Sequence, residues 1–209
     1  MWKFIQSIDL SVARAAGCLR DACGGGLTPF FKVVTLSGNF GMIFIVAGVI
    51  MLFFRRTRRV GVCSLLALLF GLLFTNIILK NSVARPRPFS DATSEFYSLW
   101  KAAGSLKESS YSFPSGHTTA AAAFGVSLFI ALNKRYSWAF LLIPVLMGFT
   151  RVYFVVHYAT DILGGLLVGG VSAAIAYYIV KKLDKNDKIA NLLPQKHFST
   201  SETYSDDYR

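Results

Sequence analysis

The length of 209 residues fits one domain, but a hydrophobic content of 54% is too high for an ordinary soluble domain of that size. A formal charge of +11 would indicate a nucleic-acid partner in a soluble protein. The basic residues cluster at the ends of apolar segments, however, and membrane topology produces that pattern. The three cysteines have spacings typical of neither a disulfide framework nor a zinc site. We therefore expect a membrane protein with no nucleic-acid partner.

Residues 1–37 form an N-terminal segment that we expect to lie at the membrane interface. Charged residues are scattered through 2–20, which argues against a spanning helix. Apolar residues nevertheless recur there at helical spacing, which favours an amphipathic helix either in the interface or packed on other helices. Thr28 and Pro29 predict the start of a further short helix that ends near Gly38.

Five apolar segments follow, over about 39–54, 60–80, 114–132, 138–156 and 162–180. At 1.5 Å per residue each is about 25–30 Å long, enough to cross a hydrocarbon core. The predicted fold is an all-α integral membrane bundle of about five transmembrane helices plus the N-terminal amphipathic interfacial helix. Residues 1–183 would form a single domain, and 184–209 a flexible cytoplasmic tail.

The charges of the connecting loops predict the orientation of this bundle. Alternating crossings place three basic clusters on one side, and the positive-inside rule makes that side cytoplasmic. The loop 81–113 then lies on the outer face of what we expect to be a bacterial plasma membrane, with a short interfacial helix near 94–103. The basic clusters are Arg55–Arg59, Lys134–Arg135 and Lys181–Lys188.

The first of three polar islands on this outer face begins at Lys80, where the second apolar segment ends. Seven residues later stands Arg87, between Pro86 and Pro88. The prolines predict a rigid extended segment that directs Arg87 inward, where it could bind an anion. We assign no role to Arg85, because a basic residue at this depth can also face headgroups or water.

The second island is Pro114-Ser115-Gly116-His117. Pro114 suits the first position of a helix, and the amides of Ser115, Gly116 and His117 would then be free to bind an anion. The Ser115 hydroxyl adds a donor, and His117 can offer a proton near neutral pH. The alternative is an ordinary helix start without chemistry.

The third island holds Arg151, His157 and Asp161. A guanidinium within an apolar run needs a partner, so Arg151 is either part of a functional site or reaches for the interface. His157 and Asp161 are four residues apart, so the carboxylate can fix the imidazole tautomer and leave the other ring nitrogen as a nucleophile. Asp161 also suits the N-cap of the last apolar helix, a role compatible with the catalytic one.

Together these strings resemble the type-2 phosphatidic acid phosphatase superfamily of integral membrane lipid phosphatases, which is related to vanadium haloperoxidases. The family's three motifs occur in order over about residues 39–182, with Thr150 where the third motif usually has serine. The matching residues are Lys80, Arg87 and Pro88 for the first motif, Pro114 to His117 for the second, and Arg151, His157 and Asp161 for the third.

The resemblance implies that His157 attacks phosphorus and forms a phosphohistidine, while Asp161 orients His157. His117 would protonate the leaving oxygen and then act as base on the water that releases phosphate. Since fixed cations and amides would replace Mg²⁺, we expect no metal and no other cofactor. The groups implied to hold the phosphoryl oxygens are Lys80, Arg87, Ser115, the Gly116 amide and Arg151.

The expected substrate is a lipid phosphate or diphosphate, with a slight preference for undecaprenyl diphosphate. The alternatives are phosphatidylglycerophosphate, phosphatidic acid and a lipid A phosphate. A haloperoxidase is disfavoured because those relatives are soluble. A non-catalytic lipid-binding or lipid-translocating protein is disfavoured by the intact His117, His157 and Asp161. The sequence predicts no oligomeric state.

Overall fold

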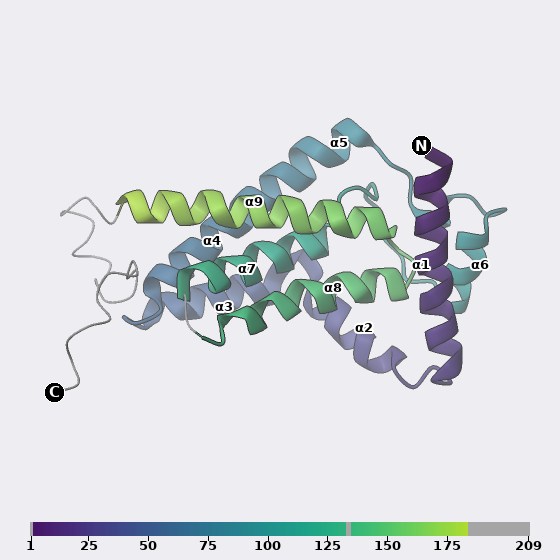
Figure 1. The fold of residues 1–209 in the computed structure, drawn as a ribbon, viewed down its shortest axis with the longest axis horizontal. Helices are drawn as coiled ribbons and strands as arrows, with labels where there is room; N and C mark the ends of the chain where they lie inside the picture. The colour runs from purple at the N-terminus through teal and green to yellow at the C-terminus, as the bar shows by residue number, and fades with distance from the viewer. Residues whose placement is uncertain (1, 133–134, 184–209) are drawn as a thin grey trace.

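The computed structural model describes residues 2–132 and 135–183, and these are helical with no β-strand (Figure 1). The predicted tail, 184–209, lies outside the described residues. In chain order the elements are α1 (Trp2–Ala22), α2 (Thr28–Ser37), η1 (Asn39–Gly41), α3 (Met42–Phe53), α4 (Arg58–Leu72), η2 (Leu73–Leu79), α5 (Lys80–Val83), η3 (Pro88–Ser90), α6 (Glu95–Ala102), α7 (Gly116–Leu132), η4 (Ser137–Leu141), α8 (Leu142–Tyr153) and α9 (Ala159–Leu183).

Five apolar helical segments stand where the sequence predicted them. The helix Arg58–Val83, formed by α4, η2 and α5, and the helix α9 are each long and apolar enough to cross a membrane. The pair α2 and η1–α3 passes the same test but is bent by 49°. The segments Gly116–Leu132 and Ser137–Tyr153 are apolar but shorter. An all-helical fold is thus confirmed, while the count of five crossings stays a prediction.

Close packing of α9 against α7 brings the starts of these two helices together. A Cβ on Gly169 would lie 2.5 Å from the Ala122 side chain and from the Thr119 carbonyl oxygen. A Cβ on Gly165 would lie 2.9 Å from the Ser115 carbonyl oxygen. Small residues allow helix backbones to approach this closely. The approach places the Pro-Ser-Gly-His segment beside the first turn of α9.

The break between α2 and α3 is a left-handed turn. Phe40 has φ 54° and Gly41 has φ 69°, so the backbone leaves the right-handed helix for two residues. α2 ends at Ser37 with Gly38 as its C-cap, as the sequence predicted. The turn presents Asn39 to the side of α7.

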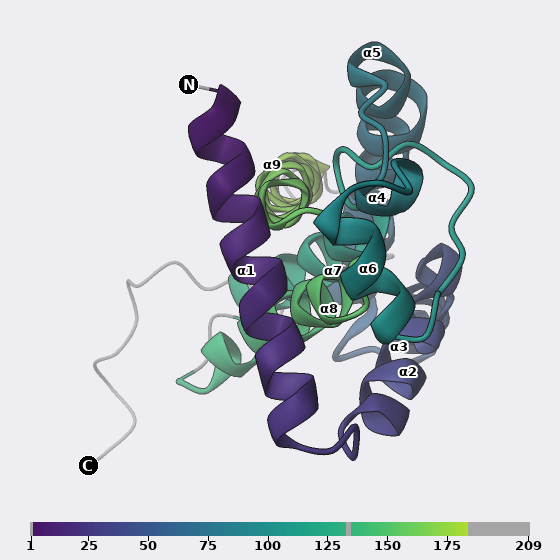
Figure 2. The ribbon, with the colours of Figure 1, turned by 90° about the vertical axis from the view of Figure 1, so that its right-hand side faces the viewer.

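The N-terminal helix α1 crosses the end of the bundle where α8 stops and α9 starts (Figures 1 and 2). One face of α1 buries Asp9, Ala13 and Ala16. Away from this face, α1 exposes large apolar side chains such as Phe4 and Ile8. The predicted amphipathic helix is therefore present and packs on the bundle, and its exposed apolar face suits an interface.

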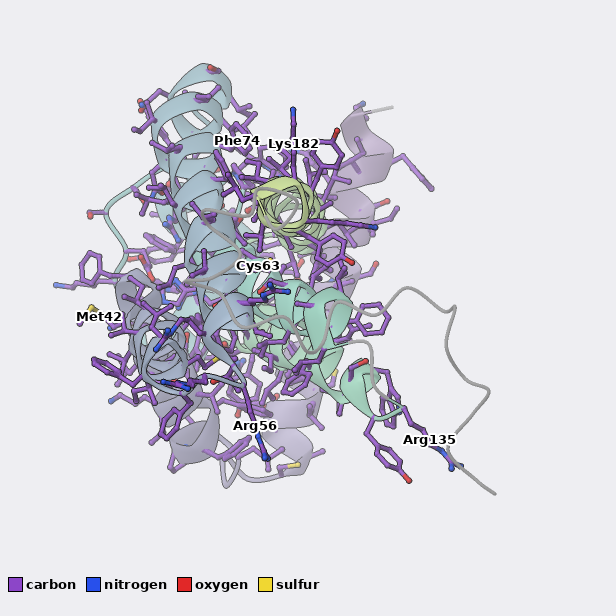
Figure 3. The ribbon with its side chains drawn as sticks, turned by 90° about the vertical axis from the view of Figure 1, so that its left-hand side faces the viewer. Met42, Arg56, Cys63, Phe74, Arg135 and Lys182 are labelled. Atoms are coloured by element: carbon purple, nitrogen blue, oxygen red, sulfur yellow. The ribbon has the colours of Figure 1, made fainter. Side chains whose placement is uncertain are left out.

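Described members of the three predicted basic clusters lie at the other end of the bundle. Arg56 in the α3–α4 turn, Arg135 before η4 and Lys182 near the end of α9 all lie at the end viewed in Figure 3. Helix α6 and the loop around it lie at the α1 end instead (Figure 2). The helix expected near 94–103 is present as α6. One residue of each predicted cluster thus lies at the same end of the bundle, while the cytoplasmic location of that end stays a prediction.

Candidate active site

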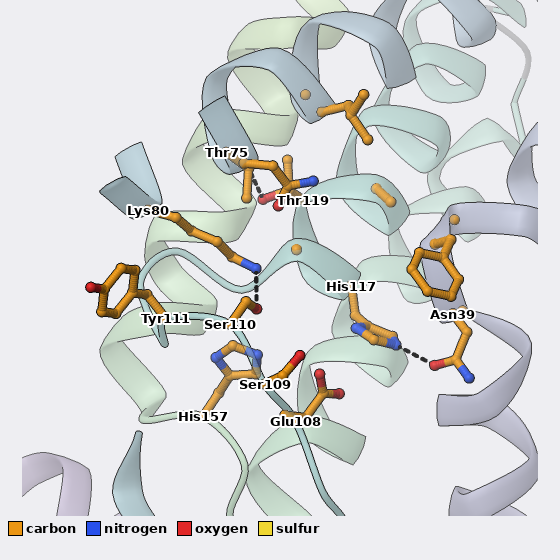
Figure 4. Close-up of a pocket in the computed structure, with 18 of the residues that line it drawn as sticks. Asn39, Thr75, Lys80, Glu108, Ser109, Ser110, Tyr111, His117, Thr119 and His157 are labelled. Atoms are coloured by element: carbon orange, nitrogen blue, oxygen red, sulfur yellow. Dashed lines mark hydrogen bonds between the residues drawn. The ribbon is translucent and has the colours of Figure 1, made fainter. Parts of the chain in front are cut away.

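A pocket of about 1250 Å³ opens at the α1 end of the bundle and collects five of the predicted site residues (Figure 4). The three others, Ser115, Arg151 and Asp161, are buried next to it. The predicted residues that line the pocket are Lys80, Arg87, Gly116, His117 and His157.

The first motif reaches the pocket through a change of backbone conformation. Helix α5 ends at Val83, and Ala84 adopts a left-handed φ of 46°. Arg87 is then extended, with φ −76° and ψ 158°, as the flanking prolines predicted. The Arg87 guanidinium donates to the Ser110 carbonyl at 2.7 Å and to the Val156 carbonyl at 2.9 Å. Lys80 Nζ donates to Ser110 Oγ at 2.9 Å.

Arg87 remains a cation although it is buried. Burial lowers the pKa of Arg87 to about 10, with the Glu108 carboxylate raising it and the Arg151 guanidinium lowering it. A group with that pKa is protonated at neutral pH. The pocket therefore holds a fixed positive charge beside His157.

His157 lies in the turn between α8 and α9, where Val155 has a left-handed φ of 51°. The ring faces two charged neighbours: its Nε2 is 3.2 Å from Arg87 Nη1, and its Nδ1 is 3.4 Å from Asp161 Oδ2. An Nδ1–H that points at the carboxylate leaves a lone pair on Nε2, which accepts from Arg87. This is the tautomer that a nucleophilic Nε2 requires.

The same environment keeps the His157 imidazole neutral. Burial lowers the pKa of His157 to about 4, while the hydrogen bond to Asp161 raises it and the Arg87 and Arg151 cations lower it. The ring is neutral at any pH above that value, so Nε2 carries a lone pair at neutral pH, which a phosphate would reach once Arg87 turns to a phosphoryl oxygen.

Asp161 is fully buried and accepts four hydrogen bonds or ion-pair contacts. Ser112 Oγ and the Tyr158 amide donate to Oδ2 at 2.5 and 2.9 Å, and Arg85 Nη1 donates to Oδ1 at 2.7 Å. The prediction that Asp161 is the N-cap of the last helix is wrong, because α9 already begins at Ala159. Asp161 sits in the first turn, and its side chain reaches back to the amide before the helix.

The prediction for the Pro-Ser-Gly-His segment needs a correction at its first two residues. α7 begins at Gly116, so Pro114 precedes the helix rather than opening it. Ser115 Oγ accepts from the Thr118 amide and hydroxyl at 3.4 and 3.0 Å, and the Ser115 amide donates to the Asp161 carbonyl at 3.1 Å. Ser115 therefore fixes the start of α7 against α9.

The remaining two residues of this segment face the pocket. Gly116 and His117 begin α7, so their amides have no acceptor inside the helix. A Cβ on Gly116 would lie 3.7 Å from Lys80 Nζ, so the missing side chain leaves open the space beside that ammonium. His117 Nε2 lies 3.0 Å from Asn39 Oδ1, at the turn between α2 and α3.

Arg151 is 1% exposed and points into the protein, which rules out the reading that it reaches for the interface. Its Nη1 donates to Thr35 Oγ1 at 2.6 Å, and its Nη2 pairs with the Glu108 carboxylate. Its Nε has no hydrogen-bond partner in the described part of the chain. An unsatisfied buried donor of this kind suits a site that receives an anion. The neighbouring Thr150, which stands where the third motif usually has serine, donates to the Met147 carbonyl within α8 and does not line the pocket.

Sequence reasoning missed several residues of the site. Arg85, left without a role, has a side chain that is 11% exposed and binds Asp161. Ser112 and Glu108 come from the loop 81–113 and Asp9 and Asn39 from the N-terminal third, where no motif marked them. A carboxylate inside a mostly apolar helix, as at Asp9, was the one available signal, because such a charge is costly without a partner.

Glu108 forms ion pairs with two cations of the site, Arg87 and Arg151. Burial raises the pKa of the Glu108 carboxyl, but the Arg151 and Arg87 guanidiniums outweigh this and lower it overall. The carboxylate is therefore ionised at neutral pH. It lies 3.7 Å from Arg87 Nη2 as well as against Arg151.

Comparison with known proteins finds several relatives of this chain. Phosphatidylglycerophosphatase B of Bacillus subtilis is 30% identical over 195 residues, covering 88% of this chain and 87% of that protein. Undecaprenyl-diphosphatase of Sulfolobus acidocaldarius is 27% identical and covers 65% of each chain. The crystal structure of a transmembrane PAP2-type phosphatidylglycerolphosphate phosphatase from Bacillus subtilis superposes with a TM-score of 0.64 at 29% identity, over 86% of this chain and 87% of that one. The model of the PAP2 superfamily matches residues 60–185, which hold all three motifs, and the chain belongs to that superfamily.

Proposed function

We propose that the protein is an integral membrane lipid phosphatase that works through a phosphohistidine at His157. One observation carries the proposal: a neutral imidazole has a carboxylate on one ring nitrogen and, at the other, a pocket lined by cations and a second histidine. A nucleophile, an orienting carboxylate and an acid–base group in one pocket form the arrangement that covalent catalysis requires.

In the first step, the lone pair of His157 Nε2 forms a bond to phosphorus as the bond to the leaving oxygen breaks. His117, entering the step as an imidazolium, gives its proton to that oxygen and becomes neutral, and the Nδ1–H of the phosphorylated ring stays hydrogen-bonded to Asp161. In the second step, His117 takes a proton from water, the water oxygen bonds to phosphorus, and His157 leaves. The charge that shifts among the phosphoryl oxygens is held by fixed donors, Lys80, Arg87, Arg151 and the amides of Gly116 and His117.

The shape of the pocket supports a lipid as substrate. Its polar residues lie at the loop end, and an apolar wall continues from them along α3 and α4. A phosphate headgroup and a hydrocarbon chain would suit these two parts. The apolar residues of this wall include Ile45, Leu65, Leu68, Leu69 and Leu72.

We take phosphatidylglycerophosphate as the first substrate to test, because the similarity to phosphatidylglycerophosphatase B extends over 88% of the chain. Undecaprenyl diphosphate is second, supported by the shorter match to an undecaprenyl-diphosphatase. Phosphatidic acid and a lipid A phosphate complete the panel. The basic end of the bundle supports a cytoplasmic location for that end and an extracytoplasmic active site in a bacterial plasma membrane.

The test is phosphate release from this panel by the purified full chain in detergent. We expect release from at least one lipid, and a loss of about 10⁴-fold or more in His157→Ala, the scale on which removal of a nucleophile acts. Lys101→Ala, an exposed change on α6, is the matched control and should keep full activity. Acid-labile phosphate trapped on wild-type protein but absent from the variant would identify the intermediate. If His157→Ala releases phosphate at the wild-type rate, the catalytic assignment is wrong.

Two further measurements separate this proposal from its rivals. Activity should persist in EDTA, because fixed cations take the role of a metal ion; strong inhibition by EDTA would contradict metal independence. Vanadate should inhibit phosphate release, whereas a haloperoxidase would need vanadate for its activity. A lipid-binding or lipid-translocating protein without catalysis would bind the panel lipids and release no phosphate from any of them.

A further inference from the structure

The N-terminal helix α1 sends one carboxylate into the catalytic end of the bundle. Asp9 is 1% exposed, although it belongs to an amphipathic helix with several charged residues on its surface. α1 passes directly over the turn between α8 and α9 (Figure 2). Asp9 lies outside residues 60–185, so the family match does not account for it.

Arg85 joins Asp9 to the catalytic carboxylate. Its Nη2 lies 2.8 Å from Asp9 Oδ2, and its Nη1 lies 2.7 Å from Asp161 Oδ1. The guanidinium also stacks over the Tyr158 ring, with 3.8 Å between Cζ and the ring centroid. A planar guanidinium fixed by two carboxylates and a stacked ring has little conformational freedom, so the position of Arg85 depends on both carboxylates.

Asp9 also binds the first turn of the helix that carries Asp161. Its Oδ1 accepts from the Thr160 amide at 2.9 Å, and the Thr160 hydroxyl lies 3.0–3.1 Å from both carboxylate oxygens. A carboxylate at a helix N-terminus satisfies an amide that has no acceptor within the helix. Asp9 thus contacts both Arg85 and the residue directly before Asp161.

We propose that Asp9 is a positioning residue for the nucleophile. Through Arg85 and Thr160 it holds Asp161 so that Oδ2 faces His157 Nδ1. The interfacial helix α1 is then part of the active site, in addition to being a membrane-facing element. This inference rests on the proposed function, because it assigns Asp9 to the step in which His157 attacks phosphorus.

The charges explain why a second carboxylate is needed. When Nε2 bonds to phosphorus the imidazole becomes cationic, and Asp161 stabilises that cation. Arg85 alone would compete with the ring for the negative charge of Asp161 in a site that excludes water. With Asp9 present, the two carboxylates and the one guanidinium carry a net charge of about −1. Asp161 then stays a strong acceptor for the ring.

The test compares Asp9→Asn with Arg14→Gln in the full-length protein. Both residues lie on α1, but Arg14 pairs with Glu95 at the surface, so its loss removes a tether of α1 without touching the site. We expect Asp9→Asn to lower kcat about 10- to 100-fold with KM within about twofold, a loss confined to the transition state. Arg14→Gln should keep both constants, and Asp9→Glu should recover part of kcat because it restores the charge.

A second variant keeps the inference testable if Asp9→Asn does not fold. Arg85→Lys keeps the cation but cannot bridge two carboxylates as a fork does, so kcat should again fall with KM little changed. Wild-type kcat in either Asp9→Asn or Arg85→Lys would overturn the inference, as would equal losses in Asp9→Asn and Arg14→Gln. A wild-type protein that releases phosphate from no lipid would instead overturn the proposed function.

Discussion

The two histidines of the pocket are held in different ways. On the His157 side, Asp161 is fully buried and accepts hydrogen bonds from Ser112, from the turn before α9 and from Arg85. On the His117 side, the ring lines the pocket and its Nε2 meets Asn39, from the turn that breaks the first apolar helix pair. One side is a closed polar network and the other an open contact.

The difference matches what each histidine has to do. A nucleophile acts on one atom from one direction, and a network that leaves its ring a single orientation favours that attack. A residue that serves first as acid and then as base must reach two oxygens in turn, the leaving group's and the water's. The structure therefore predicts that substitutions around His157 lower kcat more than substitutions around His117.

The largest effect is expected from Asp161→Asn. The amide cannot accept from the ring and from Arg85 as the carboxylate does, so His157 loses both its tautomer and its compensating charge. We expect kcat to fall about 10⁴-fold, the loss known where an Asp→Asn change places a catalytic histidine in the wrong tautomer. Steady-state phosphate release measures it, with thermal unfolding as a check on the fold. A loss smaller than tenfold would mean that Asp161 does not orient the nucleophile.

His117→Ala should cost less, about 10²- to 10³-fold, the range of general acid catalysis. The loss should depend on the substrate. An aryl phosphate has a leaving oxygen that departs without a proton, so phosphorylation of His157 should be partly rescued with it. The lipid phosphate should gain no such rescue. An equal loss with both substrates would mean that His117 does more than protonate the leaving group.

The sequence predicted the bundle better than the site because the two depend on different information. Each residue of a hydrophobic run contributes to the signal for an apolar helix. The starts of α4, α7 and α9 therefore lie within about three residues of the predicted positions. The motif residues Lys80, Arg87 and His157 were also found, since their chemistry is local to short strings. The helices and the motif residues can thus be predicted without knowing which segments contact one another in the fold.

The missed contacts all join segments that are distant in the chain. Asp9 meets Thr160 across 151 residues, and Asn39 meets His117 across 78. The pattern of a single amphipathic helix cannot reveal which helix start it will cover. The start of α7 was predicted two residues too early for the same reason, since the Ser115 amide binds the Asp161 carbonyl of another helix. Contacts between distant segments therefore determine these features, which local sequence preferences do not specify.

Asn39→Ala tests the open side with a smaller expected effect. Loss of one hydrogen bond to His117, worth about 1 kcal/mol, should lower kcat about five- to tenfold. Asn81→Ala is a matched control, because the Asn81 side chain bonds to carbonyls of its own helix near the same pocket. If Asn39→Ala lowered kcat as much as Asp161→Asn, the positions of the two histidines would be equally important for catalysis, and the proposed difference between them would be wrong.

The smallest effect concerns Glu108, which lies between the two sides. Lys80 and Arg87 both donate to Ser110, and Arg151 pairs with Glu108, so three cations meet one short stretch of the loop. An incoming phosphate has to share these cations with the Glu108 carboxylate. In Glu108→Gln the competitor is neutral and of the same size, so inorganic phosphate should inhibit more strongly.

We expect the inhibition constant of inorganic phosphate to fall about three- to tenfold in Glu108→Gln, an effect of about 1 kcal/mol. Glu95→Gln removes the same charge from the same end of the protein, but from a surface pair with Arg14, and should leave the constant unchanged. Equal shifts in both variants would indicate a long-range effect of net charge. A weaker inhibition in Glu108→Gln would mean that the carboxylate holds Arg151 in place for the phosphate, which would assign Glu108 to the closed side of the pocket.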